Sequence, residues 1–293
     1  MALPIKSKIK IRIPHLYGIY VRLRMRYRSL KKIFVMCIEW LRYRYCLYSH
    51  TPYFGIILGA SHLSHRRPQM QKCVEFEIRN YRGDFFKILE VGSWAGASAL
   101  LWATALKEFG GGCRGLVLCV DPWKPYIGPE SVGSLKPQKY ERIERALKKG
   151  KIYKLFLHNI KAAGYADIIK SLRGSSDEIL PTLQDGEFNF VYIDGSHVYS
   201  QVIRDLGNGA RLVSVGGILC GDDLELQQSQ IDFHYAEKNK GKDYILDVGV
   251  NKPFHPGVTL AVWEFFGGEV SSWDGFWAMR KTESGWQKII LDL

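Results

Sequence analysis

From residue 70 onward, short apolar runs alternate with longer stretches that have the periodicity of helices. Five runs resemble strands buried on both faces in a parallel sheet, at residues 85–92, 115–121, 166–174, 188–195 and 216–223. The spacing of apolar residues and the flanking glycines and serines predict helices at residues 71–81, 97–112, 137–164, 175–183 and 200–213. A further helix is expected over 224–240, with late strands near 276–281 and 286–293. Strands that alternate with helices predict an α/β fold with a doubly wound, mainly parallel sheet.

The first fifty residues follow a different pattern. Residues 5–13 and 19–28 alternate apolar and basic side chains, and this period of two predicts strands. From Ser29 to Tyr48 the spacing becomes helical. The expected apolar face consists of Leu30, Phe34, Cys37, Ile38 and Leu41. Such a helix, with basic residues near both ends, is typical of segments that lie at a membrane interface. Packing on the domain or on a second subunit, and binding to nucleic acid, remain open alternatives.

Charge is concentrated in the same segment. Residues 1–50 contain 12 Lys and Arg and one acid, whereas residues 51–293 contain 29 Lys and Arg and 28 acids. We therefore divide the chain into a basic N-terminal extension at residues 1–69 and a catalytic domain at residues 70–293. The extension favours an anionic membrane surface as a partner through residues 1–50.

Three features of the sequence bear on the cellular compartment. No stretch of about 18 apolar residues is present, so a membrane-spanning helix is not expected. The N-terminus lacks the charged-then-apolar layout of a signal peptide. The six cysteines form no C-x-x-C pair, which indicates reduced thiols rather than a disulfide framework or a zinc site. We expect a cytoplasmic protein, with peripheral association at a membrane surface as an alternative.

Acidic residues follow four of the predicted strands. They are Glu90, Asp121, Asp194 and the pair Asp222 and Asp223. Because ligands of doubly wound sheets bind at the carboxyl ends of the strands, these acids mark the expected site.

The turn "EVGSWAG" after the first strand predicts the kind of ligand. Gly92 allows a tight turn and Gly96 a close approach of the backbone, but the full dinucleotide fingerprint G-x-G-x-x-G is absent. Asp121, at the end of the next strand, can accept hydrogen bonds from both hydroxyls of a ribose. Glu90 would repel a phosphate and suits a ligand that carries an ammonium and a sulfonium. The turn therefore favours a cationic nucleoside over a pyrophosphate.

Several motifs resemble those of a known enzyme superfamily. The segments are "ILEVGSWAGASA", "DPW", "RGSSDEILPTL", "FNFVYIDGSHVYSQVIRDL", "GGILCGDDL" and "HPGVTLAVWEFFG". The first resembles the leading motif of class I S-adenosylmethionine-dependent methyltransferases. The order and spacing are similar to those of the macrocin O-methyltransferase group, which methylates sugar hydroxyls on natural products. The resemblance covers about residues 70–270, excludes the basic extension, and implies a Rossmann-like fold.

The resemblance also implies which residues bind S-adenosylmethionine. The matched positions are Glu90, Gly92, Ser93, Trp94, Gly96, Ser98, Asp121, Trp123, Ser175 and Ser176. Gly92, Ser93 and Gly96 would line the methionine part, with Glu90 nearby. Asp121 would hold the ribose, and Ser175 and Ser176 would meet the adenine. Trp123 would cover the adenosine, although ordinary core packing is as good an explanation for it.

Asp194, Asp222 and Asp223 form a candidate metal site. Three carboxylates that converge without a cation would repel one another, whereas Mg²⁺ or another divalent cation resolves the repulsion. In the resembled group, matching acids chelate a metal that binds two hydroxyls of the substrate. The alternative is that Asp223 caps the following helix and Asp222 faces solvent.

His197, three residues after Asp194, is the candidate general base. A metal lowers the pKa of a bound hydroxyl, and a nearby histidine can then accept the proton. We therefore assign catalytic roles to His197 and, through the metal, to Asp194. Tyr199 and His255 are candidates for contacts with the substrate. Asp205 either orients a neighbour or is a solvated helical acid.

The acceptor remains open at this stage. The expected reaction is metal-dependent transfer of a methyl group to a hydroxyl of a small-molecule or lipid-linked glycan. A catechol-type small molecule is an alternative, and so is the ribose of RNA. Enzymes that methylate amino groups of nucleic acids usually carry D/N-P-P-Y/F where this chain has "DGSH", so nucleic acid is disfavoured. A non-enzymatic assembly factor is a further alternative, and a homo-oligomer is compatible with the sequence.

Overall fold

The computed structural model describes residues 14–59, 65–111, 114–125 and 137–291, so the strand predicted at residues 5–13 lies outside the described residues. Its centre is a sheet of eight strands. Five are parallel: β1 (Phe85–Val91), β2 (Arg114–Val120), β3 (Ile169–Leu172), β4 (Phe188–Ile193) and β5 (Val213–Leu224). Three are antiparallel to their neighbours: β8 (Ser271–Trp273), β9 (Gly275–Thr282) and β10 (Gly285–Lys288). The order is β10-β9-β5-β4-β1-β2-β3, with β8 paired to β9, so the predicted doubly wound, mainly parallel sheet is confirmed.

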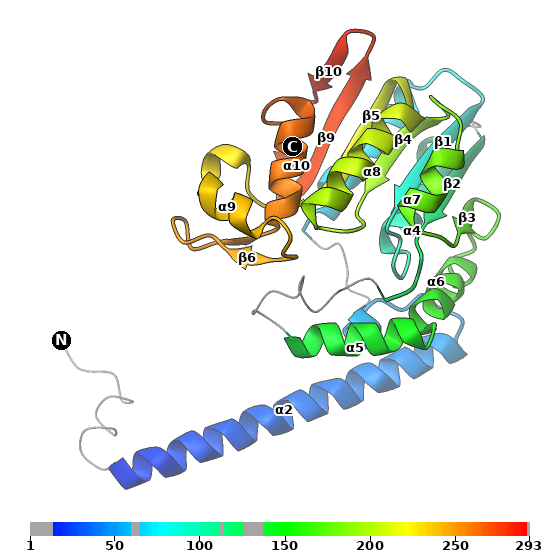
Figure 1. Cartoon of the computed structure of the whole chain (residues 1–293). Helices are drawn as coiled ribbons and strands as arrows, with labels where there is room; N and C mark the ends of the chain where they lie inside the picture. The colour runs from blue at the N-terminus through cyan, green and yellow to red at the C-terminus, as the bar shows by residue number, and fades with distance from the viewer. Residues whose placement is uncertain (1–13, 60–64, 112–113, 126–136, 292–293) are drawn as a thin grey trace.

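Helices cover both faces of this sheet (Figure 1). One hydrophobic core lies against α3 (Arg67–Asn80), α4 (Ala97–Phe109), α5 (Pro137–Lys148) and α6 (Lys151–Ala162). The other lies against α8 (Tyr199–Leu212) and α10 (Pro256–Phe266). Neighbouring residues of β1 serve both cores, because Ile88 belongs to the first and Leu89 to the second.

The predicted helix over 137–164 is divided in two. Gly150 separates α5 from α6 with a φ of 62°, a left-handed conformation that interrupts a helix and that glycine adopts at little cost. The predicted short helix after Ser175 is present as α7 (Ser176–Ile179), with the Ser175 hydroxyl as its N-cap. It continues into a 3₁₀ turn, η2 (Leu180–Thr182).

The predicted helix over 224–240 is only partly correct. Its first part forms a 3₁₀ turn, η3 (Gln228–Gln230), and the helix α9 (Phe233–Asn239) begins where the Asp232 carboxylate accepts a hydrogen bond from the Tyr235 N–H. The sequence pattern missed β8 and a separate two-stranded sheet of β6 (Ile245–Leu246) and β7 (Pro253–Phe254).

The strand predicted at residues 19–28 is wrong, because these residues belong to the 35-residue helix α2 (Pro14–Tyr48). Four of these ten residues are Arg, and Arg, Leu and Met are strong helix formers. No proline or glycine separates it from the helical residues 29–48, and helices extend cooperatively from a formed turn. Among the described residues, no helix is long and apolar enough to cross a bilayer.

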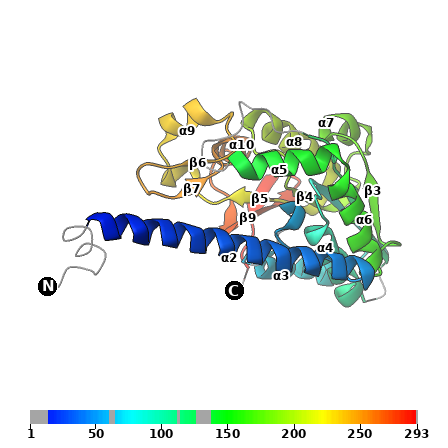
Figure 2. The ribbon, with the colours of Figure 1, turned by 90° about the horizontal axis from the view of Figure 1, so that it is seen from below.

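The connection after α2 passes along the carboxyl edge of the sheet. It contains the 3₁₀ turn η1 (Ile57–Gly59), whose Gly59 carbonyl accepts a hydrogen bond of 3.2 Å from the Trp94 indole. The Asn159 side chain of α6 bonds the backbone of Tyr53 and the carbonyl of Ala95. Figure 1 shows α2 running below the body, and Figure 2, seen from below, shows its N-terminal part extending past the body.

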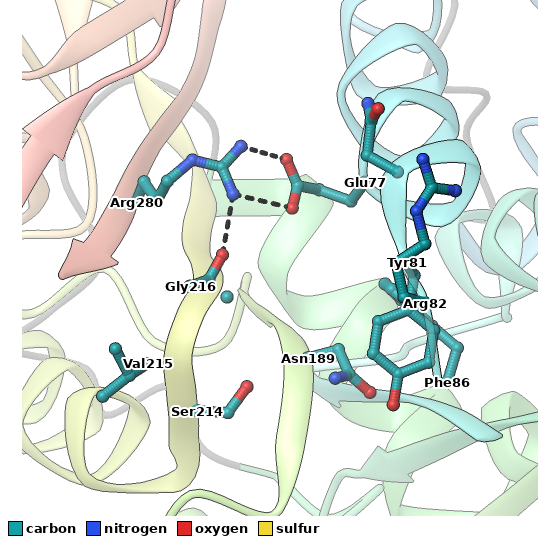
Figure 3. A pocket seen from close by; sticks show the side chains of 11 residues that line it. Glu77, Tyr81, Arg82, Phe86, Asn189, Ser214, Val215, Gly216 and Arg280 are labelled. Carbon is teal, nitrogen blue, oxygen red and sulfur yellow. Dashed lines mark hydrogen bonds and ion pairs between the residues drawn. The ribbon is translucent and has the colours of Figure 1, made fainter. Parts of the chain in front are cut away.

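The opposite edge of the sheet carries a separate cavity of about 220 Å³ near the amino ends of β1, β4 and β5. Here Arg280 of β9 forms an ion pair with Glu77 of α3 and donates a hydrogen bond of 2.7 Å to the Gly216 carbonyl (Figure 3). Arg280 thus links α3 to the strands β5 and β9 of the sheet.

Candidate functional site

The carboxyl ends of β1, β2 and β4 are joined closely at Gly92. Its N–H donates to the Val120 carbonyl at 2.9 Å, and the Asp194 N–H donates to the Val91 carbonyl at 2.8 Å. Gly92 has a φ of 89°, and a Cβ atom there would lie 1.9 Å from the Asp194 carbonyl oxygen. Only glycine lets the turn pass this close to Asp194, so the turn and this acid have fixed relative positions.

Asp121 organises the turn above β1. Its two carboxylate oxygens accept hydrogen bonds from the N–H groups of Trp94, at 3.0 Å, and Trp123, at 2.6 Å. Burial raises the pKa of Asp121 to about 6, although these bonds oppose the shift. Both tryptophans have positive φ values, which are uncommon for such bulky residues. The carboxylate of Asp121 therefore stabilises an unusual backbone conformation at this edge.

A cleft of about 240 Å³ opens beside the turn. Six of the predicted site residues line it: Gly92, Trp94, Asp121, Ser175, Ser176 and Asp194. Sequence analysis missed the contributions of Ser196 and Gln201 to its wall. Asp205 also lines the cleft and is 1% exposed, so its interpretation as a solvated acid is wrong.

The other predicted cofactor positions do not line this cleft. They are Glu90, Ser93, Gly96, Ser98 and Trp123. Trp123 is 1% exposed and packs against Tyr153 and Phe156 in the core. Its indole N–H donates to the Trp94 carbonyl at 2.8 Å. All five residues are buried, and their contact with the cofactor stays a prediction.

Glu90 lies fully buried beneath the turn. The Trp102 indole donates to its Oε2 at 2.6 Å. Burial raises the pKa of Glu90 to about 7, and the hydrogen bond from Trp102 partly opposes this shift.

Asp194, Asp222 and Asp223 meet at the ends of β4 and β5. One oxygen of each lies within 4.8 Å of the others. Asp222 is 6% exposed, so the alternative in which it faces solvent is wrong. Asp223 lies at an irregularity in the pairing of β5 with β9 and has a φ of 63°. A left-handed aspartate is tolerated at some energetic cost, and such strain is common at functional sites.

Arg66 enters this acidic cluster from the segment before α3, which the sequence analysis did not foresee. Its guanidinium Nη1 lies 2.5 Å from Asp222 Oδ1 and 2.9 Å from Asp223 Oδ1. Nη2 lies 3.2 Å from Glu225 Oε1. Burial raises the pKa of Asp222 to about 6, with Asp223 adding to the shift and Arg66 opposing it. Arg66 therefore supplies positive charge to a group of acids that would otherwise repel one another.

His197 lies between two carboxylates. Its Nε2 is 2.9 Å from Asp223 Oδ2, and its Nδ1 is 2.7 Å from Asp243 Oδ1. Burial alone would lower the pKa of His197, but Asp223 and Asp243 together raise it well above its usual range. In the same way, burial would raise the pKa of Asp223, but His255, His197 and Arg66 hold it well below its usual range.

His255 joins the cluster, whereas the hydroxyl of Tyr199 does not. The rings of His255 and His197 are 4.4 Å apart, and His255 Nδ1 lies 3.0 Å from Glu225 Oε2. Tyr199, at the start of α8, donates its hydroxyl proton to Glu264 of α10 at 2.6 Å. Its role as a substrate contact remains a prediction.

The acidic cluster fits a divalent cation by its chemistry. Carboxylate oxygens are the ligands that Mg²⁺ prefers, and Mg²⁺ is usually held by few of them. The oxygens of Asp194, Asp222 and Asp223 lie close enough to share one ion. Arg66 is already bound to two of these acids, so an ion that used all three would compete with its guanidinium.

Comparison with known proteins bears on the domain that carries this site. Residues 89–224 match a family model described as a methyltransferase domain. Among solved structures, the O-methyltransferase NovP superposes with a TM-score of 0.52 at 18% identity, covering 77% of this chain and 84% of its own. The structure of TomG, an O-methyltransferase from Streptomyces achromogenes in complex with SAM, superposes with a TM-score of 0.43 at 15% identity, covering 79% of this chain and 92% of its own. A search of curated proteins gives no significant match. The likeness to NovP supports the Rossmann-like fold.

Proposed function

We propose that this chain, whose residues 89–224 match a methyltransferase-domain model and whose fold is Rossmann-like, uses S-adenosylmethionine to methylate a hydroxyl of a sugar or glycan-type acceptor. One observation carries the proposal. Asp194 lines the cleft beside the glycine turn and is also a member of the acidic cluster that contacts His197 through Asp223. A cofactor in the cleft and an acceptor at the cluster would therefore meet at Asp194.

The wall of the cleft suits a nucleoside with a positive charge. Acids line it at Asp121, Asp194 and Asp205, and the hydroxyls of Ser175 and Ser176 lie along the same wall. In the proposal, Asp121 would hold the ribose, and Gly92 would let the ligand approach the backbone. Bound S-adenosylmethionine would supply a methyl group on a sulfonium, which leaves as a neutral thioether.

The chemistry at the acceptor follows from the arrangement around His197. Its Nδ1 lies beside Asp243, so Nε2 is the nitrogen that faces Asp223 and the cluster. We assign Nε2 as the atom that takes the hydroxyl proton, which requires that a cation bound by Asp223 offset the carboxylate charge that raises the pKa of His197. A carboxylate behind a catalytic histidine, here Asp243, fixes its tautomer and stabilises the imidazolium that forms. In the proposal, Asp194, Asp222 and Asp223 hold a divalent cation, which would lower the pKa of the acceptor hydroxyl.

A catechol-type acceptor is the second candidate, because its two adjacent hydroxyls could use the same acids and the same base. The fold does not decide between a sugar and a catechol. RNA ribose is less favoured, because outside residues 1–50 the chain has almost equal numbers of basic and acidic residues.

The test combines transfer and binding. The protein is incubated with S-adenosylmethionine labelled in its methyl group and with candidate glycans and catechols, with and without Mg²⁺, and the products are analysed by mass spectrometry. We expect a labelled sugar only when Mg²⁺ is present, and loss of transfer in Asp194→Asn. Full activity in a chelator would contradict the role of the metal, and absence of cofactor binding in calorimetry would contradict the proposed activity.

Calorimetry with Mg²⁺ alone tests the acidic cluster separately. Asp222→Asn should weaken binding of the cation. Arg66→Gln should strengthen it, because the guanidinium no longer competes for Asp222 and Asp223. Equal affinity in all three proteins would show that the cation does not bind at these acids.

A further inference from the structure

A long apolar stripe on α2 faces away from the protein body. It is formed by Leu23, Tyr27, Leu30, Phe34, Ile38, Leu41, Tyr45 and Tyr48, which are between 47% and 85% exposed. The steps between successive members are three or four residues, so these eight lie on one side of the helix, while four other exposed apolar residues, Met25, Ile33, Val35 and Trp40, lie off it. An exposed apolar surface of this length on a protein usually marks a site of contact with a partner or a membrane.

Over its last turns, from Glu39 to Cys46, the opposite side of α2 is fixed to the body. Glu39 accepts a hydrogen bond of 2.8 Å from the Tyr53 hydroxyl, and Arg42 donates to the Phe54 carbonyl at 2.5 Å. Tyr43 packs edge-on against Tyr53 at 5.1 Å, and Cys46 packs against the same small core. Because these residues hold one face of the helix against the body, the apolar stripe is held outward.

Basic residues border the stripe, and their charge favours an anionic lipid surface over a second copy of the helix as the partner of the stripe. By helical periodicity, Arg24 and Lys31 follow one border and Arg44 the other. Residues 1–50 contain 12 Lys and Arg against one acid, and that acid, Glu39, is already bound to Tyr53 and Arg42. A second copy of the helix would bring basic borders together without acids to pair with them, and like charges at such borders are unfavourable. An anionic lipid surface offers the complementary charge.

We propose that α2 lies in the surface of an anionic membrane, with this stripe in the boundary between headgroups and acyl chains and the basic borders against the headgroups. Interfacial helices have this combination of one apolar side and flanking basic residues. The inference does not depend on the proposed activity.

The attachment of α2 also orients the rest of the molecule. Its last turns reach η1 and α6, which contact the turn above β1 through Gly59, Trp94, Asn159 and Ala95. The carboxyl edge of the sheet is thus the edge nearest to α2 (Figure 1). A helix lying on a membrane would hold the cleft and the acidic cluster toward that membrane, where a lipid-linked acceptor would be presented.

Sedimentation of the full chain with vesicles tests the proposal. The vesicles are of phosphatidylcholine alone or with about a third of phosphatidylglycerol, since anionic lipid supplies the expected attraction. We expect binding at least about tenfold stronger to the anionic vesicles, and weaker binding at high salt. The double variant Leu30→Asp, Leu41→Asp should lose about tenfold or more, because charged side chains do not enter the acyl boundary.

Met25→Asp is the matched control. Met25 is 64% exposed on the side of α2 opposite the stripe, and its replacement by Asp introduces a negative charge in the same helix. Its double counterpart is Met25→Asp with Lys32→Gln, which changes the net charge by the same amount as the stripe variant. The controls should bind anionic vesicles nearly as well as the wild type, with thermal unfolding confirming that each variant is folded.

Three outcomes would overturn the proposal. They are equal binding to neutral and anionic vesicles, no binding to either, and equal losses in the stripe and control variants. Light scattering adds a separate criterion. A dimer of the wild type that becomes a monomer in the stripe variant would identify a second copy of the chain, rather than lipid, as the occupant of the stripe.

Discussion

The carboxyl group of Glu90 has no contact with solvent, and its burial makes the stability of the protein depend on pH. Its pKa rises from a usual value of 4.5 to about 7 in the folded protein. Between these values the folded state holds a proton that the unfolded state has lost, so stability falls as pH rises from the unfolded pKa through the folded pKa. Glu90→Gln removes this dependence. In urea unfolding without ligands, we expect the variant to be more stable than the wild type by roughly 2–3 kcal/mol at about pH 8, and similar to it near about pH 4.

The exposed Glu108 of α4 provides the control. Glu108→Gln should leave the difference between the two pH values close to that of the wild type. Asp121 and Asp205 also have raised pKa values, each about 6, so some pH dependence should remain in Glu90→Gln. A wild-type profile that the Glu90 variant does not flatten would contradict the shift at this residue.

At this scale the sequence predicted the acids of the site but not the residues that contact them. Asp194, Asp222 and Asp223 follow strands whose carboxyl ends must meet, so a pattern of strands is enough to bring them together. Arg66 reaches Asp223 from 157 residues away, and Asp243 reaches His197 from 46 residues away, both from irregular segments. No periodicity connects such segments to the sheet. Glu225, next to the two acids of β5, is the one partner that the sequence could have indicated.

The turn between β1 and α4 depends on the absence of a side chain at residue 92. Gly92→Ala would place a Cβ atom 1.9 Å from the Asp194 carbonyl oxygen and would also strain a backbone with a φ of 89°. We expect it to destabilise the protein by more than about 3 kcal/mol and to weaken cofactor binding, because the backbone of β1 or β4 must shift. Urea unfolding and calorimetry with S-adenosylmethionine measure the two effects.

Gly164→Ala is a control that introduces backbone strain without a collision of the new Cβ atom. Gly164 has a φ of 74°, but a Cβ atom there would meet nothing within 4 Å. It should cost only about 1–2 kcal/mol, the penalty of a left-handed alanine, without affecting cofactor binding. Equal losses in the two variants would mean that the close approach to Asp194 has no energetic importance.

Helices and strands were predictable where the spacing of apolar residues fits only one type of secondary structure. The strands β1, β2 and β4 and the helix α8 match their predicted residues closely, because apolar runs between glycines and acids leave few alternatives, whereas β3 is only four residues long. The prediction for residues 19–28 was wrong because two signals conflict there. Basic and apolar residues alternate with the period of a strand, but the Arg, Leu and Met residues among them are good helix formers. The short strands β6 and β7 have two residues each, too few for any pattern to be recognised.

For the whole molecule, the sequence predicted a basic extension apart from the domain but did not show how the two are joined. That junction depends on Asn159, a fully buried residue of α6. Its Oδ1 accepts from the Tyr53 N–H at 2.8 Å, and its Nδ2 donates to the carbonyls of Tyr53 and Ala95 at 3.1 and 2.9 Å. One side chain thus connects the segment after α2 to the turn that begins the site.

Asn159→Leu keeps a similar volume but leaves three backbone groups of Tyr53 and Ala95 without their partner. Because each unsatisfied buried group costs about 1–3 kcal/mol, we expect a loss of at least about 3 kcal/mol of stability. Trypsin should also cleave the segment around Arg42 and Arg44 faster, since the end of α2 is released from α6. Asn80→Leu, an exposed change whose side chain bonds only the Phe76 carbonyl within α3, should alter neither measurement appreciably. If cleavage in Asn159→Leu stays as slow as in the Asn80 control, other contacts of α2, such as those of Glu39 and Tyr43 with Tyr53, hold the extension in place and keep its apolar stripe outward.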